Sequence, residues 1–139
     1  MPIDEALMEF AVRVLRQILN TEVLEFERLM LSTLKQYPAN VAIVVSASDA
    51  LTEMVETLLI GAELRGEIKV ENVRRCSRWF VDGAIGPRLK QSSLGLAQLN
   101  LTDTDLDDVE AYVDFYLRAL RVQAPCSEPA SCPPLTGPV

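Results

Sequence analysis

Aspartates are concentrated at one point of the sequence, in the run DTDLDD at residues 103–108. Carboxylate oxygens are the ligands that Ca²⁺ prefers, and an EF-hand loop requires glycine at its sixth position. Here that position is Asp108. Acids in the first turn of a helix also complement the partial positive charge of its N-terminus. We therefore interpret Asp103, Asp105, Asp107 and Asp108 as the start of a helix and predict no metal site.

Histidine is absent from the 139 residues. Its absence removes the commonest general base, the commonest metal ligand and the side chain that changes charge near neutral pH. A carboxylate-bridged di-iron bundle, the enzyme that a helical chain suggests, needs Glu-x-x-His motifs that this chain cannot form. We therefore expect no catalytic residues, no enzymatic activity and no cofactor.

Three cysteines are present. Cys76 falls in a helical pattern, where we expect it to be a small buried apolar residue. Cys126 and Cys132 lie in PCSEPASCPP, and their separation differs from the short C-x-x-C spacing of zinc and redox motifs. We interpret these two as free thiols.

The charge balance narrows the range of partners. Thirteen basic and twenty acidic side chains give a net charge of -7, which repels a phosphate backbone. The longest apolar runs, such as VAIVV at 41–45, are far shorter than the roughly 20 residues that span a bilayer. The start MPIDEALMEF is acidic, whereas a secretory signal is basic. We expect a cytoplasmic protein without direct contact to nucleic acid or membrane.

The elements that position any site are helical in pattern. Apolar residues at steps of three and four predict a helix over 2–19. Asn20 and Thr21 are good N-cap residues for a second helix that we expect to reach Tyr37, where Pro38 ends it. VAIVVS at 41–46 is β-branched enough to suggest a strand. No other segment could pair with such a strand, so we favour one helix from about 40 to 64, closed by Gly66.

Two further helices are predicted in the second half of the chain. Residues 70–94 form the fourth, with Val73, Cys76, Trp79, Phe80 and Ala84 inward and a kink or break at GAIGP, 83–87. The fifth opens at Thr102 and Asp105, whose spacing allows a variant of the capping box. Five prolines in the last fifteen residues predict a disordered tail over 123–139, which leaves 1–122 as one domain.

With the helices in place, four motifs point to a known family. They are E-V-L-x-F-x-R-L at 22–29, Y-P at 37–38, L-R-G-E-I at 64–68 and G-x-x-G-P at 83–87. In this order they resemble the C-terminal ligand-binding and dimerisation domain of TetR-type transcriptional regulators, and the resemblance covers roughly residues 3–121. It implies an all-α antiparallel bundle of about five helices that encloses a small, mostly apolar effector and dimerises through its last two helices in a four-helix interface.

Several residues could line the effector pocket. An apolar site with a few polar groups is the usual composition, although any single aromatic or Met at helical spacing could instead fill the core. Thr33 stands where the family usually carries an acid, and its hydroxyl either bonds to its own helix or contacts a ligand. Arg28 could reach a ligand carboxylate, but surface ion pairs are our expectation. The pocket candidates are Met30, Thr33, Tyr37, Met54, Leu58, Trp79 and Phe80.

The last helix is apolar on two faces, which supports dimerisation independently. One stripe steps strictly by three and four, and a second consists of Tyr112, Phe115 and Ala119. A single stripe can be buried within the domain, whereas a second needs a partner surface. The dimer interface candidates are Ile85, Leu89, Leu106, Val109, Tyr112, Val113, Tyr116 and Leu120. On this assignment, Val113→Asp together with Tyr116→Asp yields monomers, because charges would be buried unpaired.

Two functions remain open. TetR-type proteins place a helix-turn-helix before this domain, whereas no such module precedes Met1, and the helix at 2–19 is too acidic for a major groove. The chain is therefore either the effector-binding and dimerisation half of a regulator, or a stand-alone module that acts by homo- or heterodimerisation without a ligand. Its expected partners are a second copy and, in the first case, a small hydrophobic effector.

Overall fold

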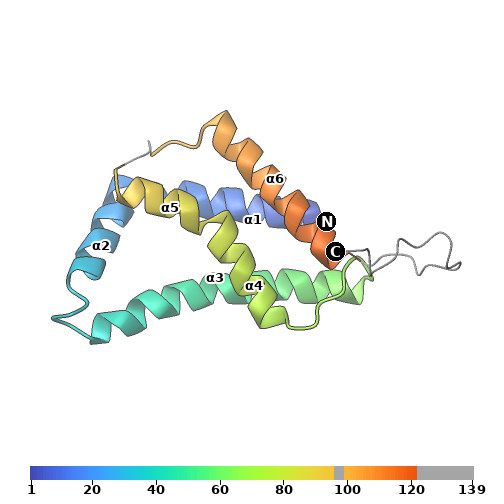
Figure 1. Ribbon diagram of the computed structural model, residues 1–139, viewed down its shortest axis with the longest axis horizontal. Coiled ribbons are helices and arrows are strands. Elements are labelled where there is room, and N and C mark those ends of the chain that lie inside the picture. The colour runs from blue at the N-terminus through green and yellow to red at the C-terminus, as the bar shows by residue number, and fades with distance from the viewer. Residues whose placement is uncertain (96–98, 122–139) are drawn as a thin grey trace, which may run out of the picture.

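The computed structural model of the chain describes residues 1–95 and 99–121. These residues form the six helices α1 (Ile3–Ile18), α2 (Thr21–Ser32), α3 (Ala39–Leu64), α4 (Val73–Ala84), α5 (Gly86–Ser93) and α6 (Asp103–Leu120) (Figure 1). Within the same residues, β structure is limited to one bridge between Ile68 and Arg121. The predicted all-α fold is confirmed. The predicted tail at 123–139, with Cys126 and Cys132, lies outside the described residues.

The core forms where α1 meets α3, α4 and α6. In Figure 1, α1, α5 and α6 lie along one side of the molecule, α3 lies along the other, and α4 runs between them. The predicted stripe of α1 is buried, including Leu7, Ala11 and Leu15. Val55 and Leu59 of α3, and Phe80 of α4, are fully buried against it. A single apolar core thus fixes the relative positions of four helices.

Caps define the helix starts where the sequence predicts them. The side chain of Asn20 accepts a hydrogen bond from the Val23 N–H at 2.9 Å. At α6, Thr102 and Asp105 form a complete capping box, each side chain accepting from the other's backbone N–H. A cap also corrects one boundary. The predicted fourth helix starts at Val73 rather than residue 70, because Asn72 caps it and the Lys69 N–H bonds to the Leu120 carbonyl instead.

The second helix is shorter than predicted. α2 ends at Ser32 instead of Tyr37, and residues 33–36 form turns. The Thr33 hydroxyl donates to the Leu29 carbonyl at 2.9 Å and accepts from the Asn40 side-chain amide at 3.1 Å. Threonine that bonds back to its own helix competes with the regular ladder, which accounts for the early end.

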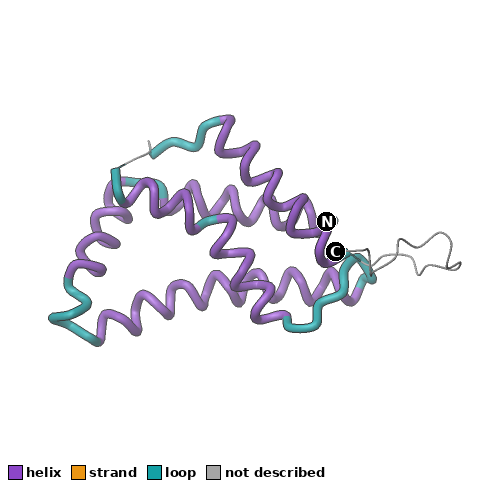
Figure 2. The backbone as a smooth tube through the Cα atoms, viewed as in Figure 1, coloured by secondary structure: helices purple, strands orange, loops and turns teal. Residues whose placement is uncertain are grey.

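The long third helix is confirmed. α3 is continuous over 26 residues, and it includes the β-branched run VAIVV (Figure 2). Gly66 follows with a φ of 77°, and the N–H groups of Gly66 and Glu67 bond to the carbonyls of Glu63 and Ala62. This is the Schellman arrangement, which favours glycine because that backbone conformation strains other residues. The predicted break in the fourth helix is also confirmed, since α4 and α5 meet at Ile85.

Candidate functional site

Aromatic side chains stand on the outer face of α4 and α6. Trp79 is 57% exposed and Phe115 is 74% exposed. Between these helices, the hydroxyl of the half-buried Tyr112 donates to the Trp79 carbonyl at 2.9 Å. The prediction that Trp79 points inward is wrong. Its neighbour Phe80 takes that position and is fully buried, because adjacent helical residues point about 100° apart.

The same periodicity divides α6 into an inner and an outer face. Phe115 is spaced four residues from Ala111 and from Ala119, and all three are exposed. Most of the other stripe packs inside the chain against α1 and α4, so its buried residues cannot supply a contact surface. This corrects part of the interface predicted from the sequence. Ile85, Val109, Val113 and Tyr116 are buried in the chain's own core, whereas Leu89, Leu106, Tyr112 and Leu120 are half-buried.

An aromatic cluster lies between α4 and α6, beneath this outer face. The ring centroid of Phe80 lies 5.1 Å from that of Tyr116 and 5.7 Å from that of Tyr112. The Tyr116 hydroxyl donates to the Cys76 carbonyl at 2.7 Å. Burial raises the pKa of both tyrosines, so both stay neutral hydrogen-bond donors at ordinary pH. The rings and their two bonds hold α4 firmly against α6.

A buried arginine joins α5 to α6. Nε of Arg88, a residue only 9% exposed, lies 3.2 Å from Oδ1 of Asp105. Its guanidinium also donates to the Ser92 hydroxyl and, at 3.0 Å, to the Asn100 carbonyl. Burial acts to raise the pKa of Asp105, but the hydrogen bonds from Thr102 and the nearby Arg88 outweigh it and hold that pKa below its usual value. This contact was not predicted from the sequence.

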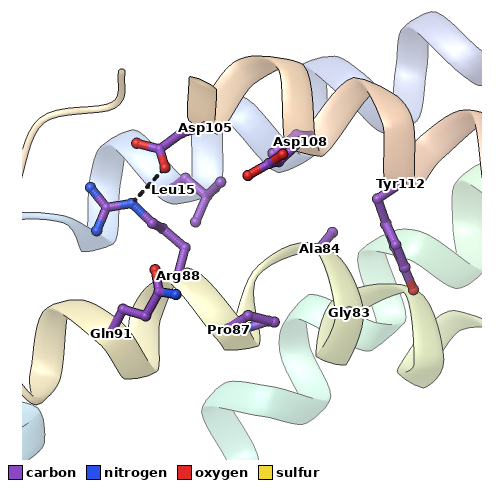
Figure 3. A pocket seen from close by; sticks show the side chains of 10 residues that line it. Leu15, Gly83, Ala84, Pro87, Arg88, Gln91, Asp105, Asp108 and Tyr112 are labelled. Carbon is purple, nitrogen blue, oxygen red and sulfur yellow. Dashed lines mark ion pairs between the residues drawn. The ribbon is translucent and has the colours of Figure 1, made fainter. Parts of the chain in front are cut away.

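Beside this pair lies a small cavity. Figure 3 shows Arg88 turned toward Asp105, with Gly83 and Tyr112 at the opposite end. The cavity measures about 130 Å³. Ligand sites usually measure roughly 300–1,000 Å³, so this one is too small for a typical effector. We interpret it as a packing gap between α5 and α6.

The pocket candidates from the sequence do not share one cavity. Met54 and Leu58 line a groove of about 450 Å³ beside Phe10, between α1 and α3. Trp79 lines a different groove of about 690 Å³ between α4 and α6. Phe80 and Met30 are buried. Tyr37 is exposed, and Thr33 makes the bonds that end α2.

Two arginines, Arg28 and Arg74, make structural contacts between helices. Arg28 does not make the expected surface ion pairs, because its guanidinium donates to the carbonyls of Ser93 and Ser92, at 2.6 and 3.2 Å. It therefore fixes the second half of α2 to the end of α5. Arg74 of α4 pairs with Asp49 and Glu56 of α3, at 3.2 and 2.9 Å. These bonds leave the grooves as the candidate binding sites.

The chain is similar in sequence and in fold to known regulators. Residues 5–122 match the family model of the AefR-like transcriptional repressor C-terminal domain. The crystal structure of a protein described as a TetR-family transcriptional regulator from Mesorhizobium loti superposes with a TM-score of 0.75 at 14% identity. The superposition covers 88% of this chain and 61% of that protein, so the chain spans less than two thirds of the other's length. No curated protein matches the chain closely enough to count as a relative.

Proposed function

Because this chain belongs to the TetR family of transcriptional regulators, as an AefR-like C-terminal domain, we propose that it forms a homodimer and binds a small apolar effector. The observation that carries the proposal is the outer face of α4 and α6. Trp79 and Phe115 are both more than half exposed there, although the helices beneath them are rigidly held. Aromatic side chains are the commonest anchors of protein interfaces.

The contribution of these two aromatic side chains to dimer affinity can be estimated. Burying a large apolar side chain contributes roughly 1.5–3 kcal/mol, so two such anchors on each chain are worth several factors of ten in the dissociation constant. Trp79→Ser together with Phe115→Ser should therefore yield monomers in sedimentation equilibrium. The control is Phe26→Ser on α2, since Phe26 is as exposed as Trp79 at 57%. A double variant that remains dimeric would contradict the proposed interface.

For the effector we propose the groove between α1 and α3. Its volume of about 450 Å³ falls within the usual range, and Phe10, Met54 and Leu58 give it an apolar lining. Glu9 and Arg13 stand among the other lining residues and offer the few polar contacts that orient a ligand. Neither Trp79 nor Phe115 lines this groove.

The dye 1-anilinonaphthalene-8-sulfonate, which becomes fluorescent in apolar sites, tests this second part. Met54→Glu should weaken dye binding at least several-fold, because it places a charge among the apolar lining. Ile60→Glu is the control, since Ile60 lies on the same helix with 48% exposure and does not line the groove. A dimer whose dye binding is the same in both variants would instead favour a dimerisation module without a ligand at this groove.

In the described residues, no helix combines the length and the apolar character needed to cross a lipid bilayer. For the whole protein, we propose that a separate module reads the DNA. A chain of net charge -7 offers no general attraction for a phosphate backbone, so its own contribution is regulatory.

A further inference from the structure

The exposed charges of α6 are unevenly distributed along the helix. Acids occupy its first half, where Asp103, Asp107, Asp108 and Glu110 are all exposed. Asp114 follows in the second half and pairs with Arg118 at 2.7 Å, and Arg121, the C-cap, adds a second positive charge at the end. Such a helix presents negative charge at one end of its outer face and positive charge at the other.

A concentration of positive charge continues from the end of α6 into the neighbouring groove. The groove of about 690 Å³ between α4 and α6, called here the α4–α6 groove, is lined by Lys69, Arg75, Arg118 and Arg121. These four basic residues are exposed, and Glu71 is the one acid beside them in the lining. The apolar part of the lining includes Trp79 and Ala119, so the groove is continuous with the proposed dimer face. In a chain of net charge -7, this groove attracts an anionic segment.

The spacing of the charges along α6 allows the acidic segment of one copy to meet the basic groove of another. Asp108 lies seven residues before Phe115 and therefore on the same outer face, and Arg118 lies ten residues after Asp108. At about 1.5 Å per residue, the two charges are roughly 15 Å apart along the helix. Two copies of α6 that run antiparallel across a two-fold axis, level with the middle of the helix, bring each acidic half to the other's basic end. A parallel arrangement would place like charges together.

We propose that the acidic first half of α6, residues 103–110, seats in the α4–α6 groove of a second copy, twice by symmetry. This inference rests on the proposed homodimer and adds the orientation of its helices and the charges that select it. Complementary charges at an interface fix register and exclude wrong partners more than they add affinity. The dimer is therefore weakened by salt, because exposed charges are screened over about 10 Å at 0.1 M.

Charge reversal gives a direct test. One variant, Arg75→Glu with Arg118→Glu, reverses the groove, and a second, Asp107→Lys with Asp108→Lys, reverses the helix start. Each variant alone faces like charges at both contacts, so its homodimer dissociation constant should rise by about tenfold or more. An equimolar mixture restores attraction at both contacts. Native mass spectrometry should then show heterodimer well above its statistical share.

Matched controls carry the same changes in net charge on exposed residues of other helices and loops. They are Arg16→Glu with Lys35→Glu, and Glu22→Lys with Glu25→Lys, none of which lines the α4–α6 groove. These pairs should mix at the statistical share, and circular dichroism verifies that every variant is folded. A statistical mixture of the two α6 variants, with the wild type still dimeric, would overturn this inference and leave the homodimer standing. A monomeric wild type would overturn both.

A third result would identify the occupant of the α4–α6 groove. If charge reversal of the groove leaves the dimer unchanged but abolishes the binding of a poly-glutamate peptide, the groove serves another anionic partner, and the second copy is not its occupant. If the peptide competes with dimerisation of the wild type, the proposed seating is supported.

Discussion

Replacing Gly83 by alanine tests how tightly α4 and α6 are packed. A Cβ at this position would lie 2.6 Å from Cε2 of Tyr112 and closer still to its Cζ and hydroxyl oxygen. Real Cβ atoms do not approach so closely, so the tyrosine ring must move. Its displacement breaks the 2.9 Å bond to the Trp79 carbonyl and the ring contact with Phe80 at 5.7 Å.

The sizes of these energies predict whether the substitution stabilises or destabilises the protein. The hydrogen bond contributes about 0.5–1.5 kcal/mol and the aromatic contacts about 0.5–1.5 kcal/mol beyond their buried area. Against these losses, alanine in place of helical glycine stabilises by up to about 1 kcal/mol. We therefore expect Gly83→Ala to destabilise the protein by up to about 2 kcal/mol. In a Tyr112→Ala background the clash is gone, and the same substitution should stabilise by roughly 0.5–1 kcal/mol.

This reversal of sign can be measured by urea unfolding at one fixed protein concentration, followed by far-ultraviolet circular dichroism. The fixed concentration matters because dissociation of the proposed dimer would contribute to apparent stability. Gly61→Ala is the control, since a Cβ there meets only the flexible Arg65 side chain, at 3.3 Å. Its effect should be the same with and without Tyr112. If Gly83→Ala stabilises both backgrounds equally, the packing of Tyr112 over Gly83 is refuted.

Three further predictions follow from buried polar and apolar groups. Val113→Asp with Tyr116→Asp should abolish helical circular dichroism rather than yield folded monomers, because both side chains are buried in the chain's own core; a folded monomer in sedimentation would restore them to the interface. Asp105→Asn should lower the free energy of unfolding at pH 7, and the deficit should fade below about pH 4. The reason is that the pKa of Asp105 is held low in the fold, so its stabilisation is lost as pH falls through that value; a deficit unchanged at pH 3 in urea titrations would contradict this. Tyr116→Phe should cost about 0.5–1.5 kcal/mol at pH 7 through loss of the bond to the Cys76 carbonyl. Because burial raises the pKa of Tyr116, the wild type should lose stability above about pH 10, and the phenylalanine variant should lose less; equal alkaline losses in the two proteins would speak against the buried neutral phenol.

Local signals were sufficient for most of the fold. Apolar steps of three and four predicted the helices, and Asn20, Gly66 and Thr102 marked boundaries through bonds formed within a few residues. The end of α2 was the exception. The Thr33 hydroxyl bonds back to its own helix and to Asn40, and this choice between competing local bonds cannot be decided from residue types alone.

The candidate site was harder to predict, because its residues come together from distant parts of the chain. Little in the sequence indicated that Arg88 is buried, because a basic residue after GAIGP is usually expected at the surface. Only the fold shows that α6 places Asp105 beside it. The pocket candidates were chosen for their residue type, and the fold separates Met54 and Trp79 into different grooves. Type and spacing define a face of a helix, but not the surface that this face meets.

By itself, the sequence determined that this protein is an acidic all-helical domain, and that its last helix has two apolar faces. Both properties depend on periodicity and composition, which are local. Only the tertiary structure decided which face is which. Val113 and Tyr116 pack against the rest of the chain, so Phe115 and Trp79 remain exposed on the proposed dimer face. That choice depends on the angle at which α4 and α1 cross α6, and crossing angles arise from the packing of whole helices rather than from any single residue.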